Sequence, residues 1–530
     1  MSRWHRILPL GAVLPLGVGA ALALALTGQQ DATPARASSH TAEKSILQDD
    51  DQLLYASPSH VVKTLHKLRG LGVDVVKVSM VWWIIAPDAN STHKPKFDAR
   101  NPKAYPPGGW ARYDLLARET HKLGMRLFLS LGPKDPAWAE ARNEPHGQGN
   151  PLGQVPDMRY FGSFVHAVGT RYDGSHRDAH GARIPRVGYW GIWNEPNWRG
   201  WLNPWRKKVH GQWHLMQPIF YRRMVNAAWK GLSTSGHGHD TILIGETANV
   251  GSVRPLPFLE DLYCVGSHYR PLTGNGAQKV GCPTSANRSR FAAHNPGLFH
   301  ITGWAHHPYG FDVAPNKPKP DRSEVTLFNI GVLERALNGV FGGYHRGRRG
   351  GFPLYLTEWG YVTNPPNPAY HTTLSEQAAW LNQGEYMTWR DPYVKALAQF
   401  LFVDVKAYWP HPTLIQWRGV FDSGLKLPHG QPKPALKAWR IPIWLPSAHH
   451  GRKVTVWGQL RPANHSHTQH GVIEFQRRGS SRWIRLRRVQ TGSSEGFVLS
   501  HVSMGRPGFV RLGWESRGHQ WYYSRSVTVS

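Results

Sequence analysis

The chain has 530 residues, of which 40% are hydrophobic, so it can bury a large core. Its formal net charge of +29 favours anionic partners, but the basic residues are scattered and match no nucleic-acid-binding motif. This composition predicts a folded protein and argues against a sequence-specific nucleic-acid partner.

The first 37 residues have the pattern of an export signal. Arg3 and Arg6 precede an apolar run over 7–26, and a polar stretch then ends in Ala35-Arg36-Ala37, a small-x-small cleavage site. The run is also long enough to span a bilayer, so a cleaved signal peptide (1–37) and an uncleaved N-terminal anchor both stay open. We expect a secreted protein, or one held at the cell surface by this segment, with membrane contact only in the second case.

From residue 45, apolar runs rich in β-branched residues alternate with helical patterns. Strands are predicted at 45–50, 73–83, 125–132, 186–193, 241–246, 299–310, 352–361 and 394–404. Helices are predicted at 57–72, 111–124, 160–172, 220–232, 324–339, 374–389 and 433–439. Repeated alternation implies parallel strands with right-handed crossovers, and hence a closed (β/α)8 barrel over 45–445. A doubly wound open sheet is the competitor, but "LQDDDQ" after the first strand is no glycine-rich phosphate turn.

The spacing of apolar residues changes after Pro446. Short alternating runs at 452–460, 471–479, 482–491, 496–504, 508–516 and 522–530 are separated by Gly, Ser, Asn or His. This pattern predicts an antiparallel β-sandwich, immunoglobulin-like or fibronectin-like, over 446–530.

The tripeptide Asn-Glu-Pro occurs twice, and its two glutamates have different surroundings. Glu195 directly follows the strand predicted at 186–193, where a barrel places its site. Glu144 lies among Gly, His, Gln and Pro beyond the third strand and is predicted to be a loop residue. Glu358 also ends an apolar strand, so Glu195 and Glu358 are expected to face each other across the pocket. Such a pair supplies the proton donor and the nucleophile of glycoside hydrolysis; the alternative is two buried glutamates held in ion pairs.

The segment "GIWNEPNW" (191–198), followed by "LTEWGY" (356–361), resembles the glycoside hydrolases of clan A, which are retaining enzymes on a (β/α)8 barrel. Supporting similarity lies in "LGVDVVKVSMVWWIIAP" (71–87), "HHPYG" (306–310) and "GQPKPALKAW" (430–439). The resemblance covers about residues 45–445 and extends to both the family 39 and the family 5 branches, between which the sequence does not decide.

The resemblance implies roles for individual residues. Glu195 matches the acid/base and Glu358 the nucleophile, with their carboxyl groups expected about 5–5.5 Å apart. Asn194 matches the residue that hydrogen-bonds the sugar 2-hydroxyl. His307 and Tyr309 match a pair that lies near the nucleophile and binds substrate.

Further residues are predicted to bind substrate. Lys77 stands where many members carry an arginine that supports the nucleophile; it keeps the charge but loses the fork of donors. Tryptophan faces suit sugar rings, although each Trp can equally fill a core. The candidate platforms are Trp359 and Trp417, and then Trp82, Trp83 and Trp198. Four carboxylates that end strands could bind a sugar or an ion, or serve only the fold: Asp49, Asp50, Glu246 and Asp404.

The only two cysteines, Cys264 and Cys282, lie in one Gly/Pro-rich segment. Two cysteines alone cannot form a structural zinc site, and an exported chain meets oxidising conditions, so a disulfide that pins a loop is predicted. Its expected contribution is about 3 kcal/mol in the entropic model. No His-Glu-x-x-His spacing indicates a metal, and we expect no cofactor.

Together these patterns predict a secreted retaining glycoside hydrolase that cleaves β-linked O-glycosidic bonds in a poly- or oligosaccharide. Anionic cell-envelope polymers are possible further partners through the basic surface. Three alternatives stay open: transglycosylation at the same site, a carbohydrate-binding scaffold on an inactive barrel, and a polyanion-binding protein whose charge is its function. The sequence leaves open the sugar and the choice between exo and endo action.

Overall fold

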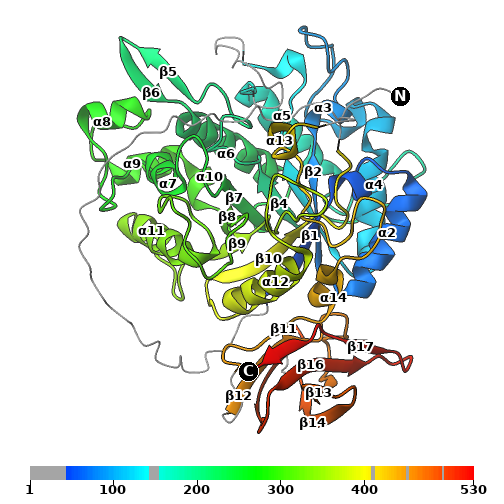
Figure 1. Cartoon of the computed structure of the whole chain (residues 1–530). Coiled ribbons are helices and arrows are strands. Elements are labelled where there is room, and N and C mark those ends of the chain that lie inside the picture. Colours follow the sequence, from blue (N-terminus) through cyan, green and yellow to red (C-terminus); the bar gives the residue numbers. More distant parts are fainter. Residues whose placement is uncertain (1–42, 142–153, 408–411, 449–452, 492–494) are drawn as a thin grey trace.

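The computed structural model describes residues 43–141, 154–407, 412–448, 453–491 and 495–530. Eight parallel strands form the centre of the larger unit (Figure 1): β1 (Lys44–Gln48), β2 (Val75–Met80), β3 (Arg126–Leu131), β4 (Tyr189–Ile192), β7 (Thr241–Ala248), β8 (Gly303–His307), β9 (Leu354–Leu356) and β10 (Val394–Phe400). They close into a barrel in chain order, and β10 pairs with β1. The predicted (β/α)8 barrel is confirmed, and the open sheet is excluded.

The barrel interior is filled by alternate residues of its strands. They form a buried cluster of their own: Ile46, Val75, Phe128, Tyr189, Leu243, Ala305, Ala396 and Ala398. Successive strand residues point to opposite faces, so neighbours such as Leu47 and Val76 pack outward in the larger core. Strands that are buried on both faces give the near-continuous apolar runs from which the barrel was predicted.

Long helices cover the outside of the barrel (Figure 1): α2 (Pro58–Leu71), α4 (Pro107–Lys122), α5 (Met158–Arg171), α6 (Gln217–Thr234), α11 (Ile330–Gly343) and α12 (Leu374–Trp389). The ends of α2 show how the sequence sets these bounds. The Ser57 side chain accepts a hydrogen bond from the backbone N of His60, and Pro58 occupies the first turn. Gly72 ends the helix with a φ of 87°, a conformation that glycine adopts at little cost.

Several elements were not predicted. A hairpin of β5 (Arg206–Val209) and β6 (Gln212–Leu215) follows β4, and α7 (Pro255–Leu262), α8 (Gly274–Lys279), α9 (Arg288–His294) and α10 (Pro296–Phe299) lie between β7 and β8. The strand predicted at 73–83 ends at Met80, and its last residues form α3 (Trp82–Ile85). The helix predicted at 433–439 is present as α14 (Pro434–Arg440). The remaining short elements are α1 (Asp50–Leu53), α13 (Leu414–Trp417) and the 3-10 turns η1 (Pro102–Ala104), η2 (Ala137–Ala139) and η3 (Leu327–Asn329).

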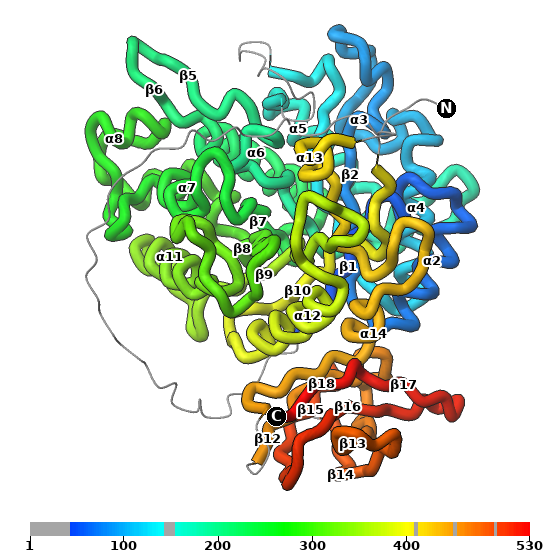
Figure 2. The backbone as a smooth tube through the Cα atoms, viewed as in Figure 1, coloured from blue at the N-terminus to red at the C-terminus, as the bar shows by residue number. Residues whose placement is uncertain are grey.

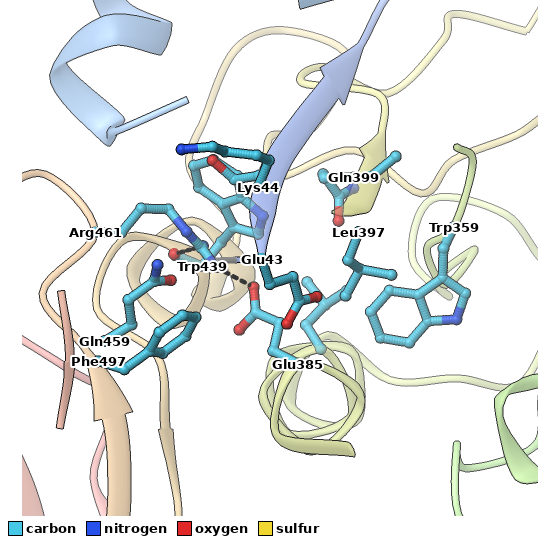
Figure 3. A pocket seen from close by; sticks show the side chains of 13 residues that line it. Glu43, Lys44, Trp359, Glu385, Leu397, Gln399, Trp439, Gln459, Arg461 and Phe497 are labelled. Atoms are coloured by element: carbon cyan, nitrogen blue, oxygen red, sulfur yellow. Dashed lines mark hydrogen bonds and ion pairs between the residues drawn. The ribbon is translucent and has the colours of Figure 1, made fainter. Parts of the chain in front are cut away.

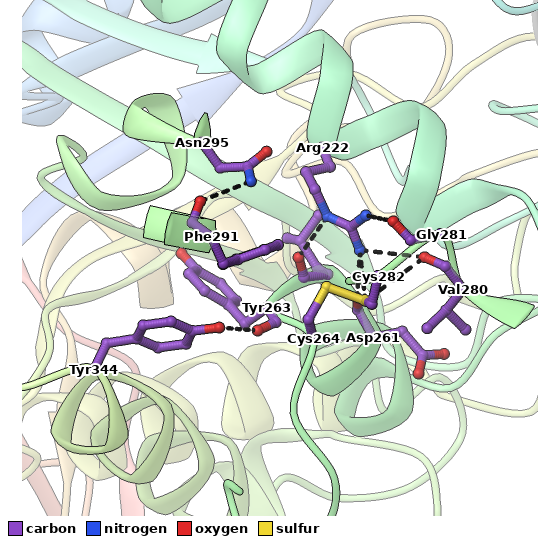
Figure 4. Close-up of a disulfide and its surroundings, with 11 residues drawn as sticks. Arg222, Asp261, Tyr263, Cys264, Val280, Gly281, Cys282, Phe291, Asn295 and Tyr344 are labelled. Atoms are coloured by element: carbon purple, nitrogen blue, oxygen red, sulfur yellow. Dashed lines mark hydrogen bonds between the residues drawn. A yellow bond between two sulfur atoms is a disulfide. The ribbon is translucent and has the colours of Figure 1, made fainter. Parts of the chain in front are cut away.

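Cys264 and Cys282 form the predicted disulfide. It joins the chain after α7 to the chain after α8, and the buried guanidinium of Arg222 lies beside it (Figure 4). Arg222, on α6, donates to the backbone carbonyls of Asp261 at 2.7 Å and Gly281 at 3.0 Å. These acceptors satisfy the buried cation, so α6 holds both ends of the disulfide-bonded segment.

Beyond α14 the chain forms two antiparallel sheets (Figure 2). One contains β11 (Ile443–Trp444), β12 (Lys453–Gln459) and β15 (Phe497–Ser503); the other contains β13 (His470–Arg477), β14 (Trp483–Gln490), β16 (Gly508–Glu515), β17 (Trp521–Tyr523) and β18 (Val527–Val529). Both sheets contribute residues to a second apolar core. The predicted sandwich is confirmed, and β11, which precedes residue 446, already belongs to it.

The sandwich packs on the end of the barrel where the strands begin (Figure 1). Lys44, at the start of β1, forms an ion pair with Glu495 at 2.6 Å. Arg461 of the sandwich donates to Glu385 of α12 at 2.6 Å and to the carbonyl of Trp439. The carboxyl ends of the barrel strands therefore face away from the sandwich.

Two sequence predictions lie outside the described residues: the signal or anchor at 1–37, and the first Asn-Glu-Pro copy with Glu144. Within the part of the chain that the structure describes, no helix combines the length and the apolar character needed to cross a membrane.

Candidate active site

Glu195 lies just beyond β4, at the C-terminal mouth of the barrel. The backbone turns sharply there, because Trp193 and Glu195 have φ values of 69° and 40°, in the left-handed region. The amide N of Glu195 donates to the carbonyl O of Glu246 at 2.9 Å, so β7 holds this turn. Strained backbone of this kind persists where surrounding contacts maintain it, and it clusters at functional sites.

Two neighbours hold the carboxyl group of Glu195. The indole Nε1 of Trp201 donates to Oε2 at 3.0 Å, and the Nδ1 atom of His307 lies 3.0 Å from Oε1. The residue is only 9% exposed. Because each oxygen has its own partner, the orientation of the carboxyl group is fixed from two sides.

Glu358 follows β9 and faces Glu195. Its Oε1 atom lies 3.5 Å from Lys77 Nζ, and its Oε2 atom accepts from the Tyr309 hydroxyl at 3.4 Å. The Nδ1 atom of His307 lies 3.6 Å from the same Oε2 atom. One carboxylate oxygen of Glu195, one of Glu358 and a ring nitrogen of His307 all lie within 4.8 Å of one another. The structure thus brings the predicted pair together.

A buried charge cluster of Lys77, Glu246 and His307 lies beneath this pair. The Oε2 atom of Glu246 lies 2.9 Å from Lys77 Nζ and 2.8 Å from His307 Nε2, and it accepts from the Thr357 hydroxyl at 2.8 Å. Gly191 on β4 leaves the room that Glu246 needs, since a Cβ atom there would lie 2.7 Å from Oε1. Each member of the cluster is at most 1% exposed.

The surroundings of Glu195 favour its protonated form. Burial raises the pKa of Glu195; the hydrogen bond and charge of His307 oppose this rise, and the charge of Glu358 reinforces it. A carboxylic acid with a raised pKa keeps its proton closer to neutral pH, as a proton donor must.

The buried charge cluster is ionised. Burial disfavours the charge on Glu246, but the charge of Lys77 and the bonds to His307 and Lys77 outweigh it and lower the pKa of Glu246 to about 2. Burial likewise opposes the charge on His307, yet Glu358, Glu195 and Glu246 raise its pKa to about 9. Lys77 loses solvation by burial, but Glu246 and Glu358 raise its pKa. Near neutral pH the cluster therefore holds two cations and one anion.

Glu195, His307 and Glu358 are the described residues whose ligand atoms lie close enough together for one metal ion. A histidine ligand must present a nitrogen without a proton. Carboxylates on two sides raise the pKa of His307 to about 9, so a metal ion would have to displace a proton from the nitrogen that it binds. The arrangement suits proton transfer and charge stabilisation better than metal binding.

The structure corrects the prediction that Lys77 binds substrate. Lys77 is 1% exposed and lies below the two glutamates. Its Nζ atom is closer to Glu246, at 2.9 Å, than to Glu358, at 3.5 Å. It supports the carboxylates rather than facing a sugar. His307 and Tyr309 are also buried, and both contact the catalytic candidates directly.

The prediction that Trp359 forms a sugar platform is wrong. Trp359 is 1% exposed and packs so close to Gly384 of α12 that a Cβ atom there would clash with its ring. It lines a small cavity near the sandwich, together with Glu43 and Glu385 (Figure 3). Glu358 and Trp359 are adjacent in the chain but contact different parts of the fold: Glu358 contacts Lys77 and Tyr309, whereas Trp359 packs against α12.

The other aromatic candidates differ in exposure. Trp82 is buried and stacks on Phe164 with ring centroids 4.8 Å apart, so it belongs to the core. Trp83, Trp198 and Trp417 are partly exposed and stay predictions. Asn194 is partly buried, and its side-chain amide has no hydrogen-bond partner among the described residues, which leaves it available to a ligand.

Of the four strand-end carboxylates, Glu246 belongs to the site and two others serve the fold. Asp49 caps α1 and accepts from the backbone N atoms of Phe402 and Val403. Asp404 forms an ion pair with Lys433 at 2.6 Å. Asp50 accepts from the backbone N of Ser79, and burial raises its pKa to about 6.

Sequence reasoning missed Trp201 and Thr357. Thr357 directly precedes Glu358, and Trp201 is the sixth residue after Glu195. Nearness in the sequence to one of the two glutamates is the one signal that could have indicated Thr357 and Trp201. It could not show that the Trp201 indole turns back to Glu195, because that depends on the path of an irregular loop.

No protein-family model matches the sequence, and no curated protein matches it. Solved structures match along most of the chain. A family 39 glycoside hydrolase from Bacteroides cellulosilyticus has 13% identity and a TM-score of 0.46, covering 89% of this chain and 81% of its own. A glucosidase from Croceicoccus marinus has 11% identity and a TM-score of 0.48, covering 88% and 96%. A monomeric β-xylosidase from Caulobacter crescentus has 14% identity and a TM-score of 0.45, covering 88% and 96%.

At these identities and TM-scores the likenesses assign no function.

Proposed function

We propose that the protein is a retaining glycoside hydrolase, with Glu195 as the acid/base and Glu358 as the nucleophile. The observation that carries this proposal is the pair of carboxylate oxygens within 4.8 Å at the C-terminal mouth of a closed barrel. Retaining enzymes hold these groups about 5–5.5 Å apart, whereas inverting enzymes need about 6.5–9.5 Å to admit a water molecule between them and the sugar. The separation supports double displacement.

In the first step, the carboxylate of Glu358 attacks the anomeric carbon while Glu195 donates its proton to the departing glycosidic oxygen. The glycosidic C–O bond breaks as the ester bond to Glu358 forms. Tyr309, Lys77 and His307 orient Glu358 from three sides. The product of this step is a glycosyl-enzyme and a free alcohol group on the leaving sugar.

In the second step, Glu195 acts as a base. It takes a proton from water as the water oxygen attacks the anomeric carbon, and the ester bond to Glu358 breaks. Two inversions restore the original configuration. Transfer to a sugar acceptor, the transglycosylase alternative, replaces only the water in this step.

The charge of His307 suits both steps. Its Nδ1 atom lies 3.0 Å from Glu195 and 3.6 Å from Glu358, so one imidazolium faces both carboxyl groups. Before reaction the negative charge is on Glu358; in the glycosyl-enzyme it is on Glu195. With Lys77 and Glu246 ionised throughout, the net charge of the site stays zero in both states. The negative charge can therefore move from Glu358 to Glu195 during the reaction without leaving an uncompensated buried charge.

We propose O-glycosidic bonds of a poly- or oligosaccharide as the substrate, with β-glycosides first among those to be tested. Export, with cleavage after residue 37 or retention of the segment as an anchor, is proposed from the N-terminal sequence alone. N-terminal sequencing of protein recovered from the medium and from the membrane fraction distinguishes the two.

The experiment that tests the function is a screen of aryl β-glycosides and polysaccharides, with the first product anomer read by NMR. We expect turnover by the wild type, a retained anomer, and loss of turnover in Glu358→Gln. An inverted product would refute the retaining mechanism. Unchanged turnover in Glu358→Gln would refute the site. If the wild type bound polysaccharides but cleaved none of the panel, the scaffold alternative would replace this proposal.

A further inference from the structure

The loop that carries Glu195 continues into the hairpin β5–β6. Among the described residues, these two strands pair only with each other, and His210 and Gly211 form their tight turn with φ values of 48° and 78°. In Figure 1 the hairpin projects from the barrel on the side away from the sandwich. A lone hairpin is marginal in water, but α8, inside the disulfide-bonded segment, contacts β6. The packing of α8 against β6 therefore stabilises a hairpin that otherwise projects from the barrel.

One face of the hairpin combines two cations with an exposed indole. Lys208 and Trp213 are paired across the strands, and Arg206 lies two residues before Lys208, on the same face. The Arg206 guanidinium lies 4.3 Å from the ring centroids of both Trp205 and Trp213, and Lys208 Nζ lies 5.3 Å from that of Trp213. Trp213 is 49% exposed. The cations are held in place over aromatic rings rather than by anions.

The positive charge of this face is not neutralised within the described structure. The sequence from 196 to 239 contains no Asp or Glu. Neither Arg206 nor Lys208 forms an ion pair with any described carboxylate. An anion from outside the chain can therefore bind both cations without displacing a partner.

The hairpin stands at a short, fixed distance from the catalytic candidates. Trp201, which contacts Glu195, precedes Arg206 by five residues, and such a stretch spans at most about 18 Å. The base of the hairpin is tied to the start of α6, because Met216 N donates to the carbonyl of Trp205 at 2.9 Å and Gln217 donates to that of Leu202 at 3.0 Å. A sugar chain that is bound at Glu195 and extends along this loop therefore has only this short span to cover before it meets Arg206.

We propose that the β5–β6 hairpin binds an acidic sugar of the substrate, so that the substrate is an anionic polysaccharide. This inference rests on the proposed glycosidase function. The anion is a carboxylate or a sulfate ester, either of which a guanidinium binds through two hydrogen bonds. Trp213 offers a flat apolar surface to the ring that carries it. The same loop thus positions the proton donor and selects a charged chain.

The test uses the full chain with Glu358→Gln, which leaves the polymers intact. Its binding to polygalacturonate, dextran sulfate and neutral dextran is measured by affinity electrophoresis. We expect the double variant Arg206→Ala/Lys208→Ala to lose at least about tenfold in affinity for an acidic polymer, the effect of one lost charge-assisted hydrogen bond. The polymer that shows the larger loss identifies carboxylate or sulfate as the ligand.

The matched control is Arg485→Ala/Arg488→Ala. It removes the same charge from exposed residues of β14 on the sandwich, away from the barrel mouth. We expect it to lose less than about twofold. Equal losses in the two double variants, or no loss in the hairpin variant, would overturn the proposal. A loss seen with duplex DNA but with neither acidic polysaccharide would also overturn it.

Two further measurements separate this inference from the proposed function. Hydrogen–deuterium exchange of the peptide that contains 206–215 should slow when polygalacturonate or dextran sulfate is added, and unchanged exchange would count against the hairpin. With Glu358 intact, the hairpin variant should cleave a small aryl glycoside within about twofold of wild type. If no glycoside is cleaved while the hairpin still governs polymer binding, the glycosidase proposal fails and the binding site stands.

Discussion

His307 places its Nε2 atom 2.8 Å from Oε2 of Glu246, and the two side chains form a buried ion pair beneath Glu195 and Glu358. The neighbouring residue shows what the pair does. His306 is equally buried but faces no carboxylate, and burial lowers its pKa to about 3. His307 keeps its proton because carboxylates surround it and raise its pKa to about 9. Partner charges, rather than burial, decide the protonation of His307.

Replacing Glu246 by Gln should change the pH dependence of catalysis. The pKa of His307 should fall from about 9, because one of its anions is lost. Once His307 is neutral, Glu195 lacks a cation that lowers its pKa, so it holds its proton to higher pH. We expect the basic limb of the kcat/KM profile of an aryl glycoside to move to higher pH, and the rate at pH 7 to fall about tenfold.

The control for this variant is Glu474→Gln, which removes a paired carboxylate from the sandwich. Its profile should match that of the wild type. A Glu246→Gln profile that is scaled down but not shifted would mean that Glu246 only fills space.

Replacing Trp201 by Phe removes one hydrogen bond and keeps most of the ring. The indole donates to Glu195 Oε2 at 3.0 Å and lowers the pKa of Glu195. We expect a fall of about tenfold in kcat/KM and a basic limb at higher pH. Trp229→Phe, on α6 and stacked on His300, is the matched control. Equal kinetics in the two variants would show that the hydrogen bond from Trp201 has no role in catalysis.

The two copies of Asn-Glu-Pro should be unequal. Glu144→Gln should keep turnover within a few-fold of wild type. Glu195→Gln should lose at least about a hundredfold on glycosides with poor leaving groups, the usual share of general acid catalysis. It should still release dinitrophenol, which needs no proton, and azide should then speed release of the sugar. An inactive Glu144→Gln beside an active Glu195→Gln would reverse the assignment.

The sequence alone predicted the larger features because they are local. Apolar runs and helix caps such as Ser57 and Gly72 marked the barrel, and Glu195 and Glu358 each ended such a run. The role of Glu246 was out of reach. Its partners Lys77 and His307 lie on other strands, and only the closed barrel brings them together.

Two misses have simple physical causes. The sequence favours Trp359 as a sugar platform because it follows Glu358, but the ring is buried against Gly384 of α12, a contact between distant parts of the chain that the sequence does not reveal. The hairpin at 206–215 escaped because its strands carry Arg, Lys and His where apolar residues usually mark a strand. The same charged residues that make the hairpin hard to predict from the sequence are the basis for its proposed role in binding an acidic sugar.

Glu43, at the junction of barrel and sandwich, should make stability depend on pH. Burial raises its pKa from 4.5 to about 8. The unfolded chain releases this proton at lower pH than the folded protein does, so the contribution to stability falls as the pH rises from about 4.5 to 8. Glu43→Gln has no carboxyl proton to lose, so it removes this loss of stability at high pH. By calorimetry we expect its Tm to match wild type at pH 4.5 and to exceed it by about 2 °C or more at pH 8. A variant less stable at pH 8 would contradict this.

Denatured protein should contain no free thiol before reduction, since Cys264 and Cys282 are its only cysteines and are bonded to each other. Thiol titration in denaturant, with and without reductant, measures this directly. Two titratable thiols in the unreduced sample would show that the disulfide is absent.

The most direct measurement is peptide mass spectrometry after inactivation with a dinitrophenyl 2-deoxy-2-fluoroglycoside of the sugar that the substrate screen selects. The fluorine slows both steps, and the good leaving group lets the first proceed, so a glycosyl-enzyme accumulates. We predict one added glycosyl group on the peptide that contains Glu358, in the wild type and in Glu195→Gln. A label on a peptide with Glu195 or Glu246, or turnover that leaves no adduct and inverts the anomer, would contradict the double displacement proposed for this site.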